Sequence, residues 1–197
     1  GFLGPAGSSR SPTASSSAAG GWTAQGEVVA AELIQALSSL DPHARSTACQ
    51  TLGQPAYRGD LRVIGQLIKR LQDHDQYVRQ AAASSLGQVA RRGDEAVISA
   101  LVTSILDSDA SVRRVSANAL GQVAQRGAQA AVPALLGRLE DKDGGVRRAA
   151  LKALGRVAEK GDGGVLRLLL AKTADGEGFV RHVAVEVLGH LADEGDS

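Results

Sequence analysis

The sequence predicts an all-α solenoid, in which helical hairpins stack side by side along one axis. Two observations lead to this fold class. Apolar residues recur at helical spacing along most of the chain, and a set of residue columns repeats every 34 residues without one insertion. The composition agrees, because aromatic residues make up only 3% of the chain and Leu, Val, Ile and Ala must therefore supply the packing.

A leucine-glycine pair marks the repeat most clearly. It occurs five times in phase, with its glycines at Gly53, Gly87, Gly121, Gly155 and Gly189. A second glycine follows six residues later in each unit, at Gly59, Gly93, Gly127, Gly161 and Gly195. Five occurrences at one fixed period cannot be chance, and a period of this size is typical of stacked repeat architectures.

Each unit is predicted to form two helices. The first begins after an acidic cap, as at Asp41 before Pro42, and is expected to run to the second glycine, which would supply a left-handed cap. The second helix follows, with apolar residues such as Val63, Leu67 and Leu71 at helical spacing. A short turn containing an aspartate then leads to the next cap.

These columns divide the chain into seven segments with about ten helices. Residues 1–26 are rich in Gly, Ser and Ala and are expected to be flexible, because such a composition cannot bury enough surface to become ordered. The same acid-poor composition fits the remnant of an organelle transit sequence, such as a plastid one. The absence of methionine predicts a processed product or a fragment. The solenoid follows as a half repeat 27–40, four repeats 41–74, 75–108, 109–142 and 143–176, and a half repeat 177–195.

The glycine after each leucine lies inside a helix, where it costs about 1 kcal/mol relative to alanine. It recurs because a neighbouring helix must come close at that point. A helix pair cannot bury its apolar face alone, so the pairs stack around one continuous core.

The columns D-x-x-V-R-x-x-A and L-G-x-V-A-x-x-G-D resemble HEAT repeats, and in particular the short HEAT-like repeats of phycobilisome bilin lyases. The resemblance covers residues 27–195 and implies a right-handed stack whose second helices line the concave face and bind proteins. It also implies a structural ladder along the stack. Each ladder arginine stands four residues after an acid, so its carboxylate partner could belong to its own unit or to the adjacent one. The ladder residues are Arg45, Arg79, Arg113, Arg147 and Arg181.

Nothing in the pattern points to catalysis or to a bound cofactor. The single cysteine, Cys49, excludes an internal disulfide and falls in a core column. His182 and His190 lie too far apart for a zinc-binding helix. The Asp-x-Asp turns lack the remaining ligands of a calcium loop and are interpreted as helix caps. We therefore expect no catalytic residue, no metal and no cofactor, and a protein that is not an enzyme.

A partner site is expected on the second helices. Its centre is small and smooth, with basic residues toward both ends, and suits an acidic or helical protein partner. The predicted contacts are Arg62, Lys69, Arg70, Ser99, Thr103, Arg138, Arg167 and Lys172. A second contact is expected at the C-terminal helix 178–193, whose apolar stripe no following helix covers.

The leading functional hypothesis is a non-enzymatic scaffold or assembly subunit of a larger complex. The resemblance also suggests a bilin lyase or chaperone subunit acting on a chromophore-bearing protein. A third alternative, nucleic-acid binding, rests on a row of basic residues, Arg114, Arg148, Lys152, Arg156 and Lys160. The net charge of +1 makes nucleic acid an unlikely partner. No apolar run is long enough to span a membrane, and the sequence names neither the partner nor the compartment.

Overall fold

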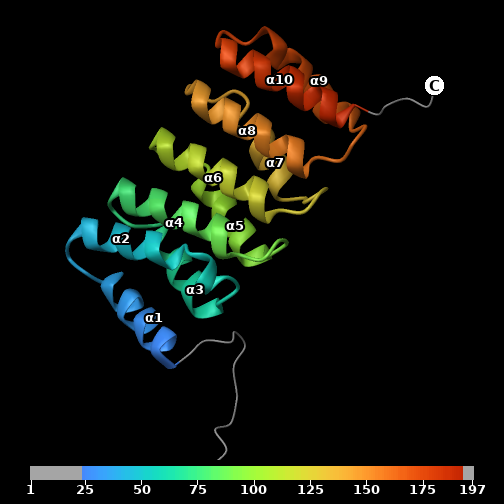
Figure 1. Ribbon diagram of the computed structural model, residues 1–197. Helices are drawn as coiled ribbons and strands as arrows, with labels where there is room; N and C mark the ends of the chain where they lie inside the picture. The colour runs from blue at the N-terminus through green and yellow to red at the C-terminus, as the bar shows by residue number, and fades with distance from the viewer. Residues whose placement is uncertain (1–23, 193–197) are drawn as a thin grey trace, which may run out of the picture.

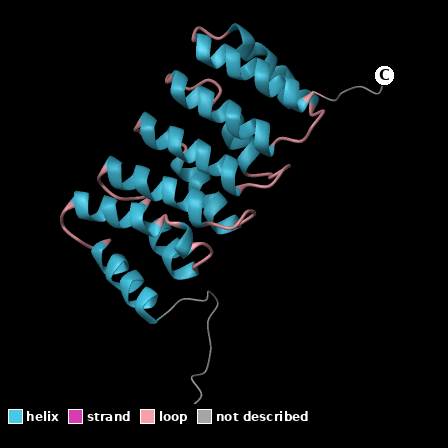
Figure 2. Cartoon of the chain, viewed as in Figure 1, coloured by secondary structure: helices cyan, strands magenta, loops and turns pink. Residues whose placement is uncertain are grey.

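The computed structural model describes residues 24–192, and this part of the chain contains ten α-helices, two short 3₁₀ helices and no strand (Figures 1 and 2). The helices form two layers. The first helices are α2 (Pro42–Leu52), α4 (Gln76–Val89), α6 (Ala110–Val123), α8 (Gly144–Val157) and α10 (Gly178–Leu191). The second helices are α1 (Ala24–Ala36), α3 (Leu61–Arg70), α5 (Glu95–Ser104), α7 (Ala131–Leu136) and α9 (Gly163–Ala171). The 3₁₀ helices are Pro55–Tyr57 and Lys172–Ala174. The all-α solenoid is confirmed.

Helix α1 lies at one end of the stack and α10 at the other (Figure 1). Because α1 begins at Ala24, residues 24–26 are helical, although we expected them in the flexible segment. The rest of that segment, 1–23, lies outside the described residues, as do Gly195 and the acidic tail 193–197.

Aspartate caps begin most of the helices. The side chain of Asp75 accepts hydrogen bonds from the backbone N–H groups of Tyr77 and Val78, at 2.9 and 3.1 Å. Asp41, Asp109 and Asp143 cap the first helices in the same way. These bonds satisfy N–H groups that have no partner inside the helix.

The prediction that each first helix runs to the second glycine is wrong. Helix α2 ends at Leu52, seven residues before Gly59, and α4 ends at Val89, four residues before Gly93, where Ala90 turns to an extended conformation. The glycine instead lies in the following loop, with a positive φ of 86° at Gly93, and its N–H donates to the carbonyl of Val123 in the next repeat at 2.7 Å. Gly59, Gly127 and Gly161 make the equivalent bond. The glycine therefore joins neighbouring repeats, because its N–H finds a partner there and not in its own helix.

In four of the five units the first glycine does mark a close helix approach, as predicted. A Cβ atom built at Gly121 would lie 2.9 Å from both the Cα and the Cβ of Ala153 in the next first helix. Backbone at that distance cannot move aside cheaply. The equivalent site in α10, Gly189, has nothing within 4 Å.

The first helices form the more closely packed layer. They pack on one another along most of their lengths, whereas neighbouring second helices, such as α3 and α5, meet at only a few residues. The expectation that the second helices line the concave face stays a prediction.

One apolar core runs between the two layers through all the repeats. Leu52, Leu86, Leu120 and Leu154 are fully buried in it, and Cys49 is buried beside them at 0% exposure. Burial raises the pKa of the Cys49 thiol to about 12, so it remains protonated and packs as a small apolar side chain.

The third repeat carries a weaker second helix. Asp60, Asp94 and Asp162 cap α3, α5 and α9, but the equivalent residue before α7 is Ala128, and no side chain caps α7. Helix α7 has only six residues.

Candidate functional site

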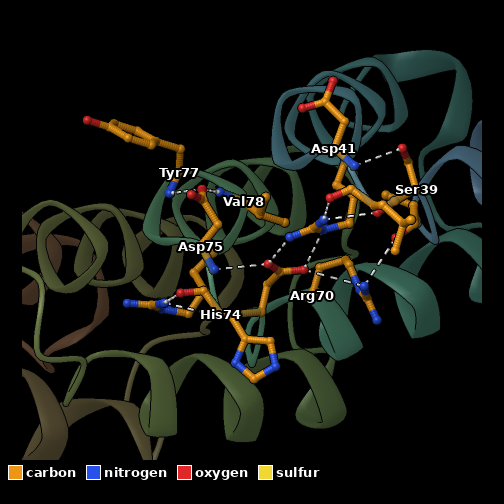
Figure 3. A network of polar contacts seen from close by, with 12 residues as sticks. Ser39, Asp41, Arg70, His74, Asp75, Tyr77 and Val78 are labelled. Carbon is orange, nitrogen blue, oxygen red and sulfur yellow. Dashed lines mark hydrogen bonds and ion pairs between the residues drawn. The ribbon is translucent and has the colours of Figure 1, made fainter.

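A ladder of arginine–aspartate pairs runs along one edge of the stack. Arg45 donates from Nε and Nη2 to the two carboxylate oxygens of Asp73, in the turn that leads to the next first helix, at 2.9 and 2.7 Å. This first junction is drawn in Figure 3, where Arg70 lies beside the pair and Asp75 caps α4. The same bidentate ion pair occurs three more times, in the pairs Arg79–Asp107, Arg113–Asp141 and Arg147–Asp175.

Each ladder arginine also donates hydrogen bonds to backbone carbonyls in the turn before its own helix. Arg113 donates from Nη1 to the carbonyls of Asp107 and Ser108, both at 2.9 Å. The guanidinium of the arginine therefore pairs with the aspartate 28 residues later, whereas the acid four residues earlier caps the helix. Each arginine thus bridges two successive turns, and the ladder joins neighbouring hairpins.

Burial and hydrogen bonding act in opposite directions on the ladder aspartates. Burial raises the pKa of Asp141, but the guanidinium of Arg113 and the backbone N–H of Asp143 outweigh it, so the pKa lies below the usual range. The pKa values of Asp73, Asp107 and Asp175 are lowered by the equivalent groups. These carboxylates are therefore ionised and paired near neutral pH.

The last ladder position differs from the other four. Arg181 holds the carbonyls of Asp175 and Gly176, at 2.8 and 3.0 Å, as its counterparts hold theirs. Within residues 24–192, however, no ion pair joins Arg181 to a carboxylate, and its side chain is exposed.

Three of the predicted partner contacts are engaged inside the chain. Arg70 donates to the carbonyl of Leu37 at 3.1 Å and pairs with Asp73, and Arg138 pairs with Asp141 at 3.6 Å. The expectation that Lys172 faces solvent is wrong, because it is only 9% exposed and its Nζ lies 2.6 Å from Glu140 Oε1. Each of these three basic residues lies at the C-terminal end of its second helix or just after it, where a carboxylate of the chain is close by.

The other predicted contacts lie on the surface of the second helices. Lys69, Ser99, Thr103 and Arg167 are exposed. Arg62 is also exposed, and it pairs with the cap Asp60 at 3.1 Å. The structure therefore leaves only part of the predicted set available to a partner.

A second surface lies on the outward side of α2, α4, α6, α8 and α10, and we call it the first-helix face. An open depression between α2 and α4 is lined by residues that include His43, Gln50, Tyr77 and Gln80. The sequence reasoning missed these residues. Polar side chains at helical spacing on the first helices were the signal that could have found them.

A further depression on the first-helix face lies between α8 and α10. Its lining includes Lys152, Arg156 and Lys160, together with Arg126, His190 and one acidic residue, Glu186. Three of these residues belong to the basic row seen in the sequence, and the structure brings them around one hollow. The spacing of four residues along α8 places Lys152 and Arg156 on one side of that helix.

The described part of the chain gives no sign of a metal centre or of a membrane span. No group of three or more His, Cys, Asp or Glu side chains lies together among residues 24–192. In the same range no helix is both long and apolar enough to cross a membrane.

Comparison with known proteins agrees with this architecture. The family model for HEAT repeats matches residues 30–121 and 103–189. A comparison with curated proteins finds no match.

Several solved structures share the fold. The complex of CpcE and CpcF of phycocyanin lyase from Nostoc sp. PCC7120 is similar at 20% identity and a TM-score of 0.63, covering 82% of this chain and 98% of that one. A designed armadillo repeat protein in complex with the peptide (KR)4 is similar at 19% identity and a TM-score of 0.62, over 81% and 80%. An engineered protein reaches 22% identity and a TM-score of 0.65, over 84% and 82%. At these identities the similarity shows a common fold, and the family match over most of the described residues shows that the chain belongs to the HEAT-repeat family.

Proposed function

We propose that this chain is a non-enzymatic scaffold that binds an acidic segment of a protein partner along its first-helix face. The observation that carries the proposal is the pair of open depressions on this face. The lining of one includes two amides and Tyr77, and the lining of the other includes four basic side chains and a single carboxylate, Glu186.

The depression between α2 and α4 offers contacts suited to a peptide. Gln50 and Gln80 can each donate and accept hydrogen bonds, as the backbone of an extended peptide requires. Tyr77 is 65% exposed at the same depression, and tyrosine is among the residues that carry most binding energy in protein interfaces. A segment lying here could pair its backbone with the amides and pack a side chain on the ring.

The depression between α8 and α10 supplies charge. Lys152, Arg156 and Lys160 are exposed, and within residues 24–192 none of the three forms an ion pair. Arg70, Arg138 and Lys172 on the second helices already pair with carboxylates of this chain. An acidic partner therefore meets more available positive charge on the first-helix face, where complementary charge favours both encounter and specificity.

A displayed library of random peptides tests the proposal with two matched double variants. The wild-type chain should enrich sequences rich in Asp and Glu. The variant Lys152→Glu/Arg156→Glu should lose this enrichment, because it reverses the charge of one depression. The variant Lys69→Glu/Arg167→Glu changes charge equally on the second helices and should keep it, and circular dichroism checks that both variants fold.

Two results would overturn the first-helix site. Loss of enrichment only in Lys69→Glu/Arg167→Glu would move the site to the second helices. Tight binding of an RNA or DNA oligonucleotide that weakens steeply with salt would assign the basic residues to nucleic acid instead.

Action on a chromophore-bearing protein is the second candidate. The similarity to phycocyanin lyase favours it, although that similarity is one of fold. Mixing the chain with a linear tetrapyrrole should then shift the absorbance of the pigment, and an unchanged spectrum would exclude this function.

A further inference from the structure

Two columns of polar residues run along the stack, at and just after the C-terminal ends of the first helices. One column has an exposed cation in each of four repeats, and we call it the loop column: Arg58, Arg92, Arg126 and Lys160. The other column stands four residues earlier in the chain and has an exposed amide in three repeats and a cation in the fourth, in the order Gln54, Gln88, Gln122 and Arg156. Arg126, Arg156 and Lys160 line the depression between α8 and α10, so both columns lead into the cationic site described above.

The backbone beside the loop column is fixed in the same way in every repeat. The glycine that follows each cation donates its N–H to the last carbonyl of the next first helix, at 2.8 Å from Gly59 and 2.7 Å from Gly93. Gly127 and Gly161 make the same bond at 2.8 and 2.9 Å. Because this contact is repeated, the step from one cation to the next follows the step between neighbouring first helices, which lie side by side along the stack (Figure 1). Packed helices are about 8–10 Å apart.

The cations of the loop column keep their charge available to a partner. Arg92 donates from Nε to the carbonyl of Ala124 at 3.2 Å, and Arg126 donates from Nη1 to the carbonyl of Ala158 at 2.8 Å. These neutral acceptors in the next repeat orient each guanidinium and use one of its five N–H donors. Within residues 24–192 none of the four cations forms an ion pair. The aspartate that follows two residues later in three of the repeats caps a second helix instead.

The step of the loop column selects one conformation of an acidic segment. In a polyproline II helix every third residue returns to the same side after about 9.3 Å. The same-side step is about 6.7 Å in a β-strand, and in an α-helix the seventh residue returns after about 10.5 Å. Only the polyproline II step falls within the interval of about 8–10 Å between packed helices. A polyproline II backbone has no internal hydrogen bonds, so its carbonyls are free to accept from the amides of Gln54, Gln88 and Gln122.

We propose that the loop column and the glutamines beside it bind an acidic polyproline II segment of a protein partner, with a carboxylate at every third residue. One end of the segment lies in the depression between α8 and α10, and about ten residues are enough to place a carboxylate near each of the four cations. The inference rests on the function proposed above, since it takes the acidic partner from there and adds its conformation and the spacing of its charges.

Two peptides of identical composition test the spacing. One consists of four repeats of Asp-Pro-Pro, and the other of four repeats of Asp-Pro followed by four prolines. Proline favours the polyproline II conformation in both, so they differ in how the carboxylates are arranged around the helix. Fluorescence anisotropy at low ionic strength should show the Asp-Pro-Pro peptide binding the wild-type chain about tenfold more tightly, because it can make about two more ion pairs and each exposed pair contributes a factor of roughly three.

Two double variants test the residues. Arg92→Gln/Arg126→Gln removes two cations of the loop column and should abolish the preference for the Asp-Pro-Pro peptide. Arg91→Gln/Arg114→Gln removes the same charge from exposed positions outside the column, so it should weaken the binding of both peptides alike and keep the preference. Circular dichroism checks that both variants are folded.

Three results would overturn the inference. The first is equal binding of the two proline peptides by the wild-type chain, and the second is a preference that survives Arg92→Gln/Arg126→Gln. The third is equally tight binding of a helical peptide with four glutamates, one at every seventh residue. Acidic enrichment in the displayed library without any preference for spacing would leave the function proposed above standing, whereas absence of acidic enrichment would overturn both.

Discussion

Replacing Arg113 with alanine should be among the most damaging single changes in this chain. Arg113 is 5% exposed and donates four hydrogen bonds, two to Asp141 and two to backbone carbonyls. Its removal leaves the carboxylate of Asp141, which is 9% exposed, with the N–H of Asp143 and the more distant Arg138. Breaking a buried ion pair in this way costs about 3–5 kcal/mol, and the remaining partners of Asp141 place the expected loss near the lower value.

Arg181→Ala is the matched control, because it removes the same side chain from the same column. Arg181 holds two carbonyls at an exposed site but no carboxylate in the described part of the chain. Its loss should cost only about 1 kcal/mol or less. Urea unfolding followed by circular dichroism gives both values, and if the repeats unfold in more than one step the first transition is compared.

Most of the destabilisation in Arg113→Ala should come from the unpaired negative charge of Asp141. The double variant Arg113→Ala/Asp141→Asn removes that charge and should recover part of the stability lost in Arg113→Ala. The free energy of unfolding of Arg113→Lys should lie between those of the wild-type chain and Arg113→Ala, because an ammonium group cannot form the bidentate ion pair. Equal destabilisation by Arg113→Ala and Arg181→Ala would refute the assignment of the ladder as a stabilising structure.

Three further predictions follow from the packing and the caps. In the folded state, four ladder aspartates have pKa values below the unfolded value of about 3.9, namely Asp73, Asp107, Asp141 and Asp175. The ion pairs of these aspartates therefore stabilise the fold fully above about pH 3.9, and this stabilisation is lost as the pH falls through the folded-state pKa values. The melting temperature should therefore fall steeply only below about pH 4, whereas a loss that is complete by pH 5 would contradict the pairing. Gly121→Ala should destabilise the fold by about 1–3 kcal/mol, because the added Cβ would meet the Ala153 backbone. Gly189→Ala should stabilise the fold by up to about 1 kcal/mol, because the space there is open. If both variants shifted the melting temperature in the same direction, close packing would be excluded as the reason for the glycine. Ala128→Asp should stabilise by about 1 kcal/mol by capping α7, and an unchanged urea midpoint would show that the cap at this position has no effect.

The repeat, the helical hairpins and the aspartate caps can be predicted from the sequence, because each depends on residues close together in the chain. The spacing of the apolar columns specifies helices, and an aspartate before a helix binds N–H groups only two or three residues away, as Asp75 does. The close approach at Gly121 was also predictable, since a glycine that recurs inside a helix requires a reason and packing supplies one.

Which residues far apart in the chain meet depends on how the hairpins pack in three dimensions. The carboxylate that binds Arg45 is 28 residues away, while the acid four residues before it caps the helix, and sequence spacing could not choose between them. Nor could it show that Lys172 is paired with Glu140, or that the N–H of Gly93 binds the next repeat and not its own helix. These contacts depend on the rotation and distance between stacked hairpins, which the helical period leaves open and the packing of the whole layer sets.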